Sequence, residues 1–517
     1  MDRKFLNFYL ALSVLFFLES FSNSSSLANE ALAIESSPDG SRGNLESKIV
    51  SREGVGFLSV NDVVDNAWSL LCPLAELLAK DTIKAVVLLL GGQNINMRLA
   101  RTYLTDLQKL KKIYGKPIVA YTESMLSAED YVVACGADAI VVAPLTKVGG
   151  IGYRWQYDYC FEKDKKDQKV LNFIYSGKFK DISMHLSPKP EHIKIFEQCI
   201  NKAYGELVKE ISDRRPNAGI NKEKWIQGNW FNAKEALSLG LVDCIADQID
   251  LIGYVTNLAG CSYLNLTNTE LFIKKEVNDS SFVHTSNNQR AHAGVLKIDQ
   301  LTSNSIWDYG HYLLELFKDE SVDKIILYIS SCGGELESSL SFHSDVLKLK
   351  QMYKKPVIAY LDVALSGGYL IATAADYIIA GPGARVGSVG VCLERWDFTN
   401  KNKNDQVKVV SVSTGKSFAI KDTSIVLDTP TKEFLQKQLT LTHAKFIQLV
   451  KLSRPNLKNN EVHWAEAQKF IAHDALYIGL IDAIGTPLDA ISYGNQDNDE
   501  TLSDFNLVFK SIAKKNK

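Results

Sequence analysis

The chain has 517 residues, of which 46% are hydrophobic and 23% are charged, and 58 Lys plus Arg against 60 Asp plus Glu give a net charge of -2. This length is enough for two to four globular domains with sizeable cores. The balanced charge, without a basic stripe interleaved with aromatic residues, argues against a nucleic-acid-binding protein. The eight cysteines are scattered without a CxxC pair, so we expect no metal site, and no other motif indicates a cofactor.

The start of the chain has the pattern of an export signal. Two basic residues, Arg3 and Lys4, precede residues 5–18, which carry no charge. That stretch is shorter than the roughly 20 apolar residues of a membrane-spanning helix and has the length of a signal-peptide core. Ala31-Leu-Ala33 is a candidate cleavage site. Residues 1–33 are therefore predicted to be a signal peptide or an uncleaved signal anchor, so the protein is exported either way.

Beyond a polar tether at residues 34–49, the chain repeats itself. Three motifs recur in the same order at a shift of 238 or 239 residues: 116–121 at 355–360, 148–152 at 386–390, and 236–243 at 475–482. Such a long period excludes a solenoid and indicates two homologous domains. We predict these domains at residues 50–260 and 291–490, with a linker at 261–290 and a polar tail at 491–517.

Short apolar runs alternate with longer amphipathic ones in both halves, which predicts parallel sheets flanked by helices in an α/β fold. In the first half we expect strands near 54–60, 84–90, 117–121 and 139–143. In the second half we expect strands at 294–299, 324–329, 356–360 and 377–380, and helices at 305–319, 336–353 and 367–375.

Ser366 lies between the predicted strand at 356–360 and the predicted helix at 367–375. A serine at this point can present its hydroxyl to a cleft, near the backbone N–H groups of the helix start. The alternative is that Ser366 only caps the helix, the commonest role of a serine before a helix.

A second loop, Ser330-Ser-Cys-Gly-Gly-Glu335, follows the neighbouring strand. Its glycine pair lets backbone N–H groups turn into a cleft, as an oxyanion hole requires, although a tight turn explains the pair equally well. Both loops leave the carboxyl ends of parallel strands, so we expect them to face one crevice. Gly333, Gly334 and Gly367 are the candidate oxyanion-hole residues.

No histidine lies between residues 366 and 442, so a Ser-His-Asp triad is not indicated, and His343 and His443 are weak candidates for a base. A lysine is the usual substitute, provided that burial or a nearby cation lowers its pKa. Ser176-Gly-Lys-Phe-Lys180 offers Lys178 and Lys180 at alternate positions, so an extended chain would point both to one face.

Together, the motifs at 366–376, 387–390, 333–334 and 177–180 resemble signal peptide peptidase A, the long tandem form of the protease IV family. The resemblance covers roughly residues 50 to 490. It implies two crotonase/Clp-protease-like domains, with Ser366 as nucleophile and Lys180 as base. Lys178, Gly368 and Ser388 lie in the same motifs and are expected to support the site.

The resemblance also implies a membrane-associated serine endopeptidase that degrades cleaved signal peptides and other extended apolar peptides. The implied assembly is a homotetramer on the periplasmic side of the inner membrane. A non-proteolytic crotonase-like acyl-transfer enzyme and an inactive scaffold are the alternatives.

Two features depart from the family pattern. Asp181 directly follows the candidate base, where the family has a small or hydroxyl residue, and a carboxylate there would keep the lysine charged. In the first half, Met125-Leu-Ser-Ala-Glu-Asp-Tyr131 replaces the Leu-Ser-Gly-Gly-Tyr motif, which leaves the role of Ser127 open. One composite site, with its lysine from the first half and its serine from the second, fits this pattern.

Overall fold

The computed structural model describes ten segments of the chain: residues 54–60, 66–91, 95–153, 170–180, 189–261, 293–399, 423–424, 426–458, 460–494 and 507–510. All of them belong to one compact unit, Arg52–Lys517. The predicted leader, the tether, Asp181 and all of the linker except Cys261 lie outside the described residues. No helix within the described segments has the length and apolar character needed to cross a membrane.

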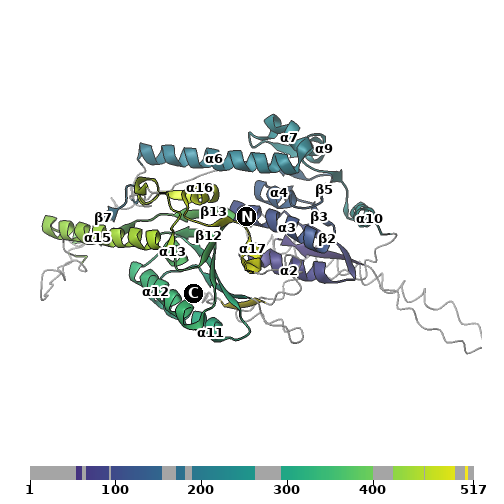
Figure 1. Ribbon diagram of the computed structural model, residues 1–517. Helices are drawn as coiled ribbons and strands as arrows, with labels where there is room; N and C mark the ends of the chain where they lie inside the picture. Colours follow the sequence, from purple (N-terminus) through teal and green to yellow (C-terminus); the bar gives the residue numbers. More distant parts are fainter. Residues whose placement is uncertain are drawn as a thin grey trace, which may run out of the picture. The chain divides into compact units, whose positions relative to one another are not determined.

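The first half contains a parallel sheet, as predicted, and it has a fifth strand beside the four that were expected. Its strands, in spatial order, are β1 (Gly54–Ser59), β2 (Ile83–Leu89), β3 (Ile118–Thr122), β5 (Ala139–Val142) and β9 (Cys244–Ile245). The additional strand is β9, and Figure 1 labels β2, β3 and β5 of this sheet. A separate small sheet contains β4 (Met125–Leu126), β6 (Lys147–Gly149) and β8 (Trp230–Asn232). The helices are α2 (Trp68–Ala79), α3 (Met97–Tyr114), α4 (Ala128–Ala134), α6 (Pro190–Arg214), α7 (Pro216–Ile220), α8 (Lys222–Trp225), α9 (Ala233–Ser238) and α10 (Gln248–Leu258).

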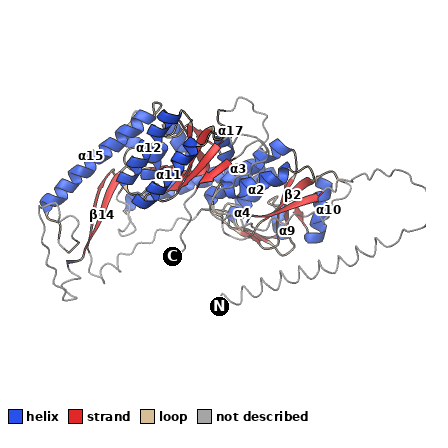
Figure 2. Cartoon of the chain, turned by 90° about the horizontal axis from the view of Figure 1, so that it is seen from below, coloured by secondary structure: helices blue, strands red, loops and turns tan. Residues whose placement is uncertain are grey.

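The second half contains a seven-stranded sheet. Its main path is β15 (Lys469–Ile471), β13 (Tyr377–Gly387), β12 (Val357–Leu365), β11 (Lys324–Ser331), β10 (Ala293–Ile298) and β17 (Leu507–Lys510), and β16 (Ala483–Ile484) also pairs with β13. Only the β13–β15 pairing is antiparallel. The helices are α11 (Ser303–Lys318), α12 (Leu336–Tyr353), α13 (Gly367–Ala372), α15 (Thr429–Ser453), α16 (Ala472–Ile478) and α17 (Pro487–Ser492), with a 3₁₀ turn at Glu461–His463. Figure 2 shows the helices packed around the strands.

The predicted strands and helices of both halves are confirmed, and three of them differ clearly in length from the prediction. β12 and β13 run several residues further than expected, and α13 ends at Ala372 rather than at residue 375. All nine residues of β12 are buried, as expected for a largely apolar strand in the middle of a parallel sheet, and Asp362 is its one charged residue. The polar tail also differs from expectation, because it contains β17, whose Leu507-Val-Phe509 run pairs with β10.

The two halves share a hydrophobic core. Leu104 and Leu107 of α3 belong to the same buried cluster as Ile358 and Tyr360 of β12. Near this contact, Arg98 Nε donates to the buried carboxylate of Asp362 over 3.1 Å. Removing Arg98 would leave the buried Asp362 carboxylate without its counter-charge, so this pair favours the observed arrangement of the two halves.

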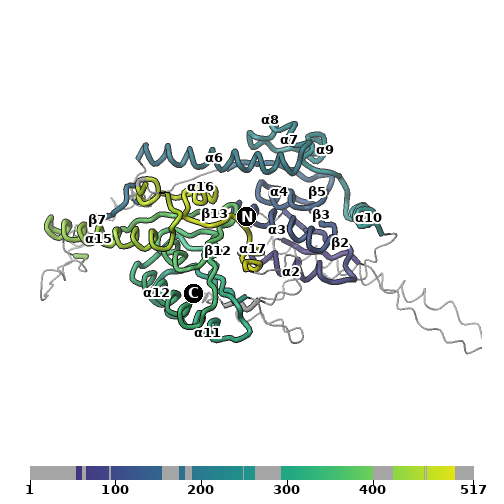
Figure 3. Tube along the Cα trace, in the orientation of Figure 1, coloured from purple at the N-terminus to yellow at the C-terminus, as the bar shows by residue number. Residues whose placement is uncertain are grey.

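A strand of the first half also enters the second half. β7 (Val170–Ser176) forms a two-stranded antiparallel ribbon with β14 (Val391–Asp397), in which Ser176 pairs with Val391. The helix α15 packs against both strands of this ribbon. Figures 1 and 3 label it beside β7, and Figure 2 labels it beside β14. The register places the residues after Ser176 next to the loop between β13 and β14.

Candidate active site

The backbone at Ser366 is held in a strained conformation. Its φ of 53° and ψ of -121° lie outside the regions that non-glycine residues favour. The Ser366 N–H donates to the Gly387 carbonyl over 2.9 Å, which ties the turn to the end of β13. The hydroxyl makes no capping hydrogen bond to α13, so the helix-cap alternative is wrong. Instead, Ser366 Oγ lies 2.9 Å from Lys180 Nζ.

Ser127 provides the contrast within the same chain, because it lies 239 residues before Ser366 and also precedes a helix. Its φ is -68°, and its hydroxyl accepts from the Asp130 N–H (3.4 Å) and donates to the Asp130 carboxylate (3.1 Å). Ser127 is therefore an ordinary helix cap. The two copies of this position have taken different roles.

Lys180 reaches Ser366 from a turn rather than from an extended strand. The Lys180 N–H donates to the Gly177 carbonyl (3.0 Å), so the expectation that Lys178 and Lys180 point to one face is wrong. The Lys178 side chain is exposed, and its ammonium lies 5.3 Å from the centre of the Phe179 ring. Two bonds to Glu466 hold the turn: the Lys178 N–H donates to its carboxylate and the Phe179 N–H to its carbonyl. Only Lys180 meets the serine.

Burial lowers the pKa of Lys180 from 10.5 to about 8. The largest cause is desolvation of the ammonium; the Cys392 thiol opposes the shift, and the like charge of Lys469 adds to it. Lys469 is itself exposed, so solvent screens part of its effect. A substantial fraction of Lys180 is therefore neutral at mildly alkaline pH and able to accept a proton.

The glycine loop meets the serine, as the crevice prediction requires. Gly333 has a φ of 111°, and a Cβ added there would lie only 2.8 Å from Ser366 Cβ. Added Cβ atoms would also collide with Leu301 at Gly334 and with Ser339 at Gly367, while one at Gly368 would touch the Ser331 carbonyl. The Gly333 N–H already donates to the Ser331 hydroxyl over 3.3 Å.

Ser388 is the third polar group at this point. Its hydroxyl lies 3.2 Å from Lys180 Nζ, and its side chain is buried. Its φ of 55° is strained for a serine, whereas Gly150, the equivalent residue in the first half, has a φ of 68° without penalty. Ser388 thus holds a strained conformation that its glycine counterpart adopts freely, and its hydroxyl contacts Lys180.

The two candidate histidines lie elsewhere. His343 is buried on α12, and burial lowers its pKa to about 4. His443 is buried on α15 and contacts Ser176 rather than Ser366. Within the described residues no hydrogen bond joins Ser366 to a histidine, and no group of three His, Cys, Asp or Glu side chains is placed to hold a metal ion.

Three features around the site were missed from the sequence: the side chain of Lys469, the strained backbone of Ser388, and the contact of His443 with Ser176, the residue before the Lys180 turn. Pairing the two halves residue by residue points to all three, because the first half has Trp230, Gly150 and Tyr204 at these positions.

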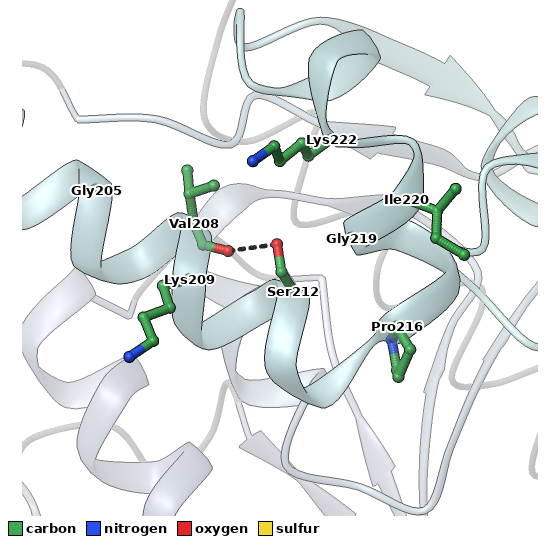
Figure 4. A pocket seen from close by; sticks show the side chains of 8 residues that line it. All are labelled: Gly205, Val208, Lys209, Ser212, Pro216, Gly219, Ile220 and Lys222. Atoms are coloured by element: carbon green, nitrogen blue, oxygen red, sulfur yellow. Dashed lines mark hydrogen bonds between the residues drawn. The ribbon is translucent and has the colours of Figure 1, made fainter.

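A separate surface pocket lies between α6 and α7, away from the described serine and lysine (Figure 4). In it the Ser212 hydroxyl donates to the Val208 carbonyl over 2.7 Å.

The fold and the site define a duplicated α/β protein in which a strained serine of one half meets a half-buried lysine of the other. The chain belongs to Peptidase family S49, whose profile matches residues 110–261 and 349–499. The two matches confirm that the halves are homologous.

The similar proteins are also named as proteases. Protease 4 from Haemophilus influenzae is 24% identical over 419 residues, which cover 76% of this chain and 67% of that protein. A putative protease from Methanocaldococcus jannaschii is 32% identical over 184 residues, covering 35% of this chain and 58% of that protein. A solved mutant of the membrane-bound stomatin-specific protease 1510-N is 19% identical, with a TM-score of 0.27, covering 44% of this chain and 99% of that one. The matched regions thus span 58% and 67% of the two curated relatives.

Proposed function

We propose that this protein is a serine endopeptidase with a Ser366/Lys180 dyad. The observation that carries the proposal is the 2.9 Å distance between Lys180 Nζ and Ser366 Oγ, at a lysine whose pKa burial lowers to about 8. Membership of Peptidase family S49 supports a protease over the crotonase-like acyl-transfer enzyme and over the inactive scaffold.

In the proposed mechanism, neutral Lys180 accepts the proton of the Ser366 hydroxyl as Oγ attacks the carbonyl carbon of the scissile peptide. Backbone N–H groups of Gly333, Gly334 and Gly367 are the proposed donors to the resulting oxyanion. Of these, the Gly333 N–H must first leave the Ser331 hydroxyl. The Lys180 ammonium then gives its proton to the leaving amine, and an acyl-enzyme ester remains.

Deacylation uses the same groups in the reverse direction. Neutral Lys180 accepts a proton from a water molecule, which attacks the ester carbonyl. The ammonium returns the proton to Ser366 Oγ as the carboxylic acid product leaves. The Ser388 hydroxyl contacts Lys180 Nζ and would orient it toward Ser366 throughout the cycle.

Signal-peptide remnants and other extended apolar peptides are the proposed substrates. This choice rests on the family and on its relatives, which include a putative signal peptide peptidase from Enterococcus faecium, 27% identical over 198 residues. Attachment to the membrane through residues 1–33, a position on the periplasmic side, and assembly into a homotetramer remain proposals from the family resemblance. Lys178 and Gly368 keep their proposed supporting roles.

The proposal is tested by covalent labelling with a fluorophosphonate between pH 6 and 10. We expect labelling of Ser366, located by mass spectrometry, at a rate that rises with a midpoint near pH 8 and falls sharply in Lys180→Ala. Labelling that survives Lys180→Ala and is lost in Lys178→Ala would assign the base to Lys178. An assembled wild-type protein that does not label would favour the inactive scaffold.

A substitution at Ser388 distinguishes the effect of its hydroxyl on catalysis from the effect of its strained backbone on stability. We expect Ser388→Gly to raise the free energy of unfolding by up to about 1 kcal/mol, because relief of the strained φ of 55° outweighs the lost contact to Lys180, itself about 1 kcal/mol. The same change should lower kcat about tenfold, since Lys180 loses its 3.2 Å partner. Denaturant unfolding and peptide hydrolysis measure the two effects. A stabilised variant with unchanged kcat would show that the hydroxyl is dispensable.

A further inference from the structure

His443 connects three pieces of chain that surround the dyad. Its Nδ1 lies 2.8 Å from the Ser176 hydroxyl, at the end of β7. Its Nε2 lies 2.8 Å from the Ala465 carbonyl and 3.1 Å from the Val389 carbonyl. The ring is buried on the inner face of α15. All three partners are therefore fixed to one rigid helix.

The chemistry of these partners sets the proton positions on the ring. Carbonyl oxygens can only accept, so Nε2 carries a proton and donates to Ala465 and Val389. In the neutral ring Nδ1 is then an acceptor, and the Ser176 hydroxyl donates to it. The side chain uses both of its nitrogens in this way.

Each partner lies next to a group of the site. Ser176 directly precedes the turn Gly177–Lys180, which carries the lysine. Val389 lies between Ser388, which contacts Lys180 Nζ, and Gly390, whose carbonyl is 3.5 Å from Ser366 Oγ. Ala465 precedes Glu466, which holds the same turn through two backbone N–H groups.

The equivalent of His443 in the first half shows the role of this position where no catalytic lysine lies nearby. Tyr204 occupies it on α6, a helix of 25 residues like α15. The Tyr204 hydroxyl lies 3.1 Å from the Ile151 carbonyl and 2.5 Å from the Ile226 carbonyl. Ile151 and Ile226 are equivalent to Val389 and Ala465 at the shifts of 238 and 239. Clamping two carbonyls is thus the shared structural role, and the contact to Ser176 is what the histidine adds.

We propose that His443 is a positioning residue that holds the Ser176–Lys180 turn in place, so that the lysine of the first half meets the serine of the second. The proposal deepens the proposed function and rests on it. His443 does not touch the reacting atoms; it acts through Ser176 and the turn that follows.

His443→Tyr is the decisive variant. Tyrosine can keep the contacts to two carbonyls that Tyr204 makes, but it has no acceptor where the Nδ1 atom of His443 meets the Ser176 hydroxyl. We expect His443→Tyr and Ser176→Ala each to slow fluorophosphonate labelling about tenfold at pH 7.5, since the lysine is no longer held against the serine. In both variants the pH at which the labelling rate is half-maximal should move from about 8 toward 10.5. The reason is that a loosened turn exposes Lys180 to water, which raises its pKa toward the free value. The titratable groups near Lys180 are Cys392 on β14 and Lys469 on β15, and both variants leave them unchanged.

The two substitutions remove the same contact, so the double variant should label no more slowly than either single one. Tyr204→Phe and His343→Phe are the matched controls, in the first half and on α12. Each should lower stability without moving the midpoint.

The proposal would be overturned if both His443→Tyr and Ser176→Ala labelled at the wild-type rate and with the wild-type pH midpoint. His443 would then have only the structural role of Tyr204, which is to contact two carbonyls. If His443→Tyr does not fold, Ser176→Ala decides alone. Failure of the wild type to label would instead contradict the proposed function, so the two failures are distinguishable.

Discussion

Ser366→Ala is expected to lower kcat/KM for peptide hydrolysis by at least about 10⁴-fold, because it removes the only atom that forms the acyl-enzyme. The fold should survive, since the Ser366 N–H bond to Gly387 is a backbone contact that alanine keeps. The strained φ of 53° is as costly for alanine as for serine, so the free energy of unfolding should change by less than about 1 kcal/mol.

Ser127→Ala is the control for this prediction, because Ser127 is the equivalent serine of the first half. It should leave kcat/KM unchanged and cost about 1 kcal/mol of stability through the lost helix cap to Asp130. Hydrolysis of an apolar peptide carrying a fluorescent reporter, with denaturant unfolding of each variant, gives both quantities. If Ser366→Ala retained wild-type turnover, another group would have to be the nucleophile.

Lys180→Met is expected to abolish turnover and at the same time to stabilise the folded protein near pH 7. The folded-state pKa of about 8 lies below the unfolded value of 10.5, so below pH 8 the fold holds a charged ammonium that burial disfavours. The shift corresponds to a destabilisation of about 3 kcal/mol. Methionine loses the contacts to Ser366 and Ser388, each contributing about 1 kcal/mol, so a net gain of about 1 to 2 kcal/mol should remain.

The pH dependence of this difference follows from the sign of the shift. Between pH 8 and 10.5 the unfolded chain binds more protons than the folded one, so the stability of the wild type rises with pH in that window. The advantage of Lys180→Met should therefore be complete below pH 8 and shrink as the pH approaches 10.5. Urea unfolding at pH 7, 9 and 10.5 measures it. An equal difference at all three values would show that the lysine carries no burial penalty.

The sequence by itself determined the duplication, the α/β class and the strands and helices that bear the site. Buried parallel strands such as β12 are apolar runs, interrupted there only by Asp362, and repeated motifs at one shift are visible without coordinates. The same reasoning identified the Ser366 and Gly333 loops as neighbours, because consecutive parallel strands end at one edge. It failed for the polar tail, where a short apolar run finds an edge strand to pair with.

Only the tertiary structure decided which lysine meets the serine and which serine is the cap. Lys178 and Lys180 are indistinguishable by spacing, and the turn held by Glu466 separates them. Ser127 and Ser366 both precede helices, and their backbone angles assign them opposite roles. The burial that lowers the pKa of Lys180 and the contact of His443 with Ser176 join residues of different halves. Such contacts depend on how β7 packs against β14 and α15, which no local pattern of residues encodes.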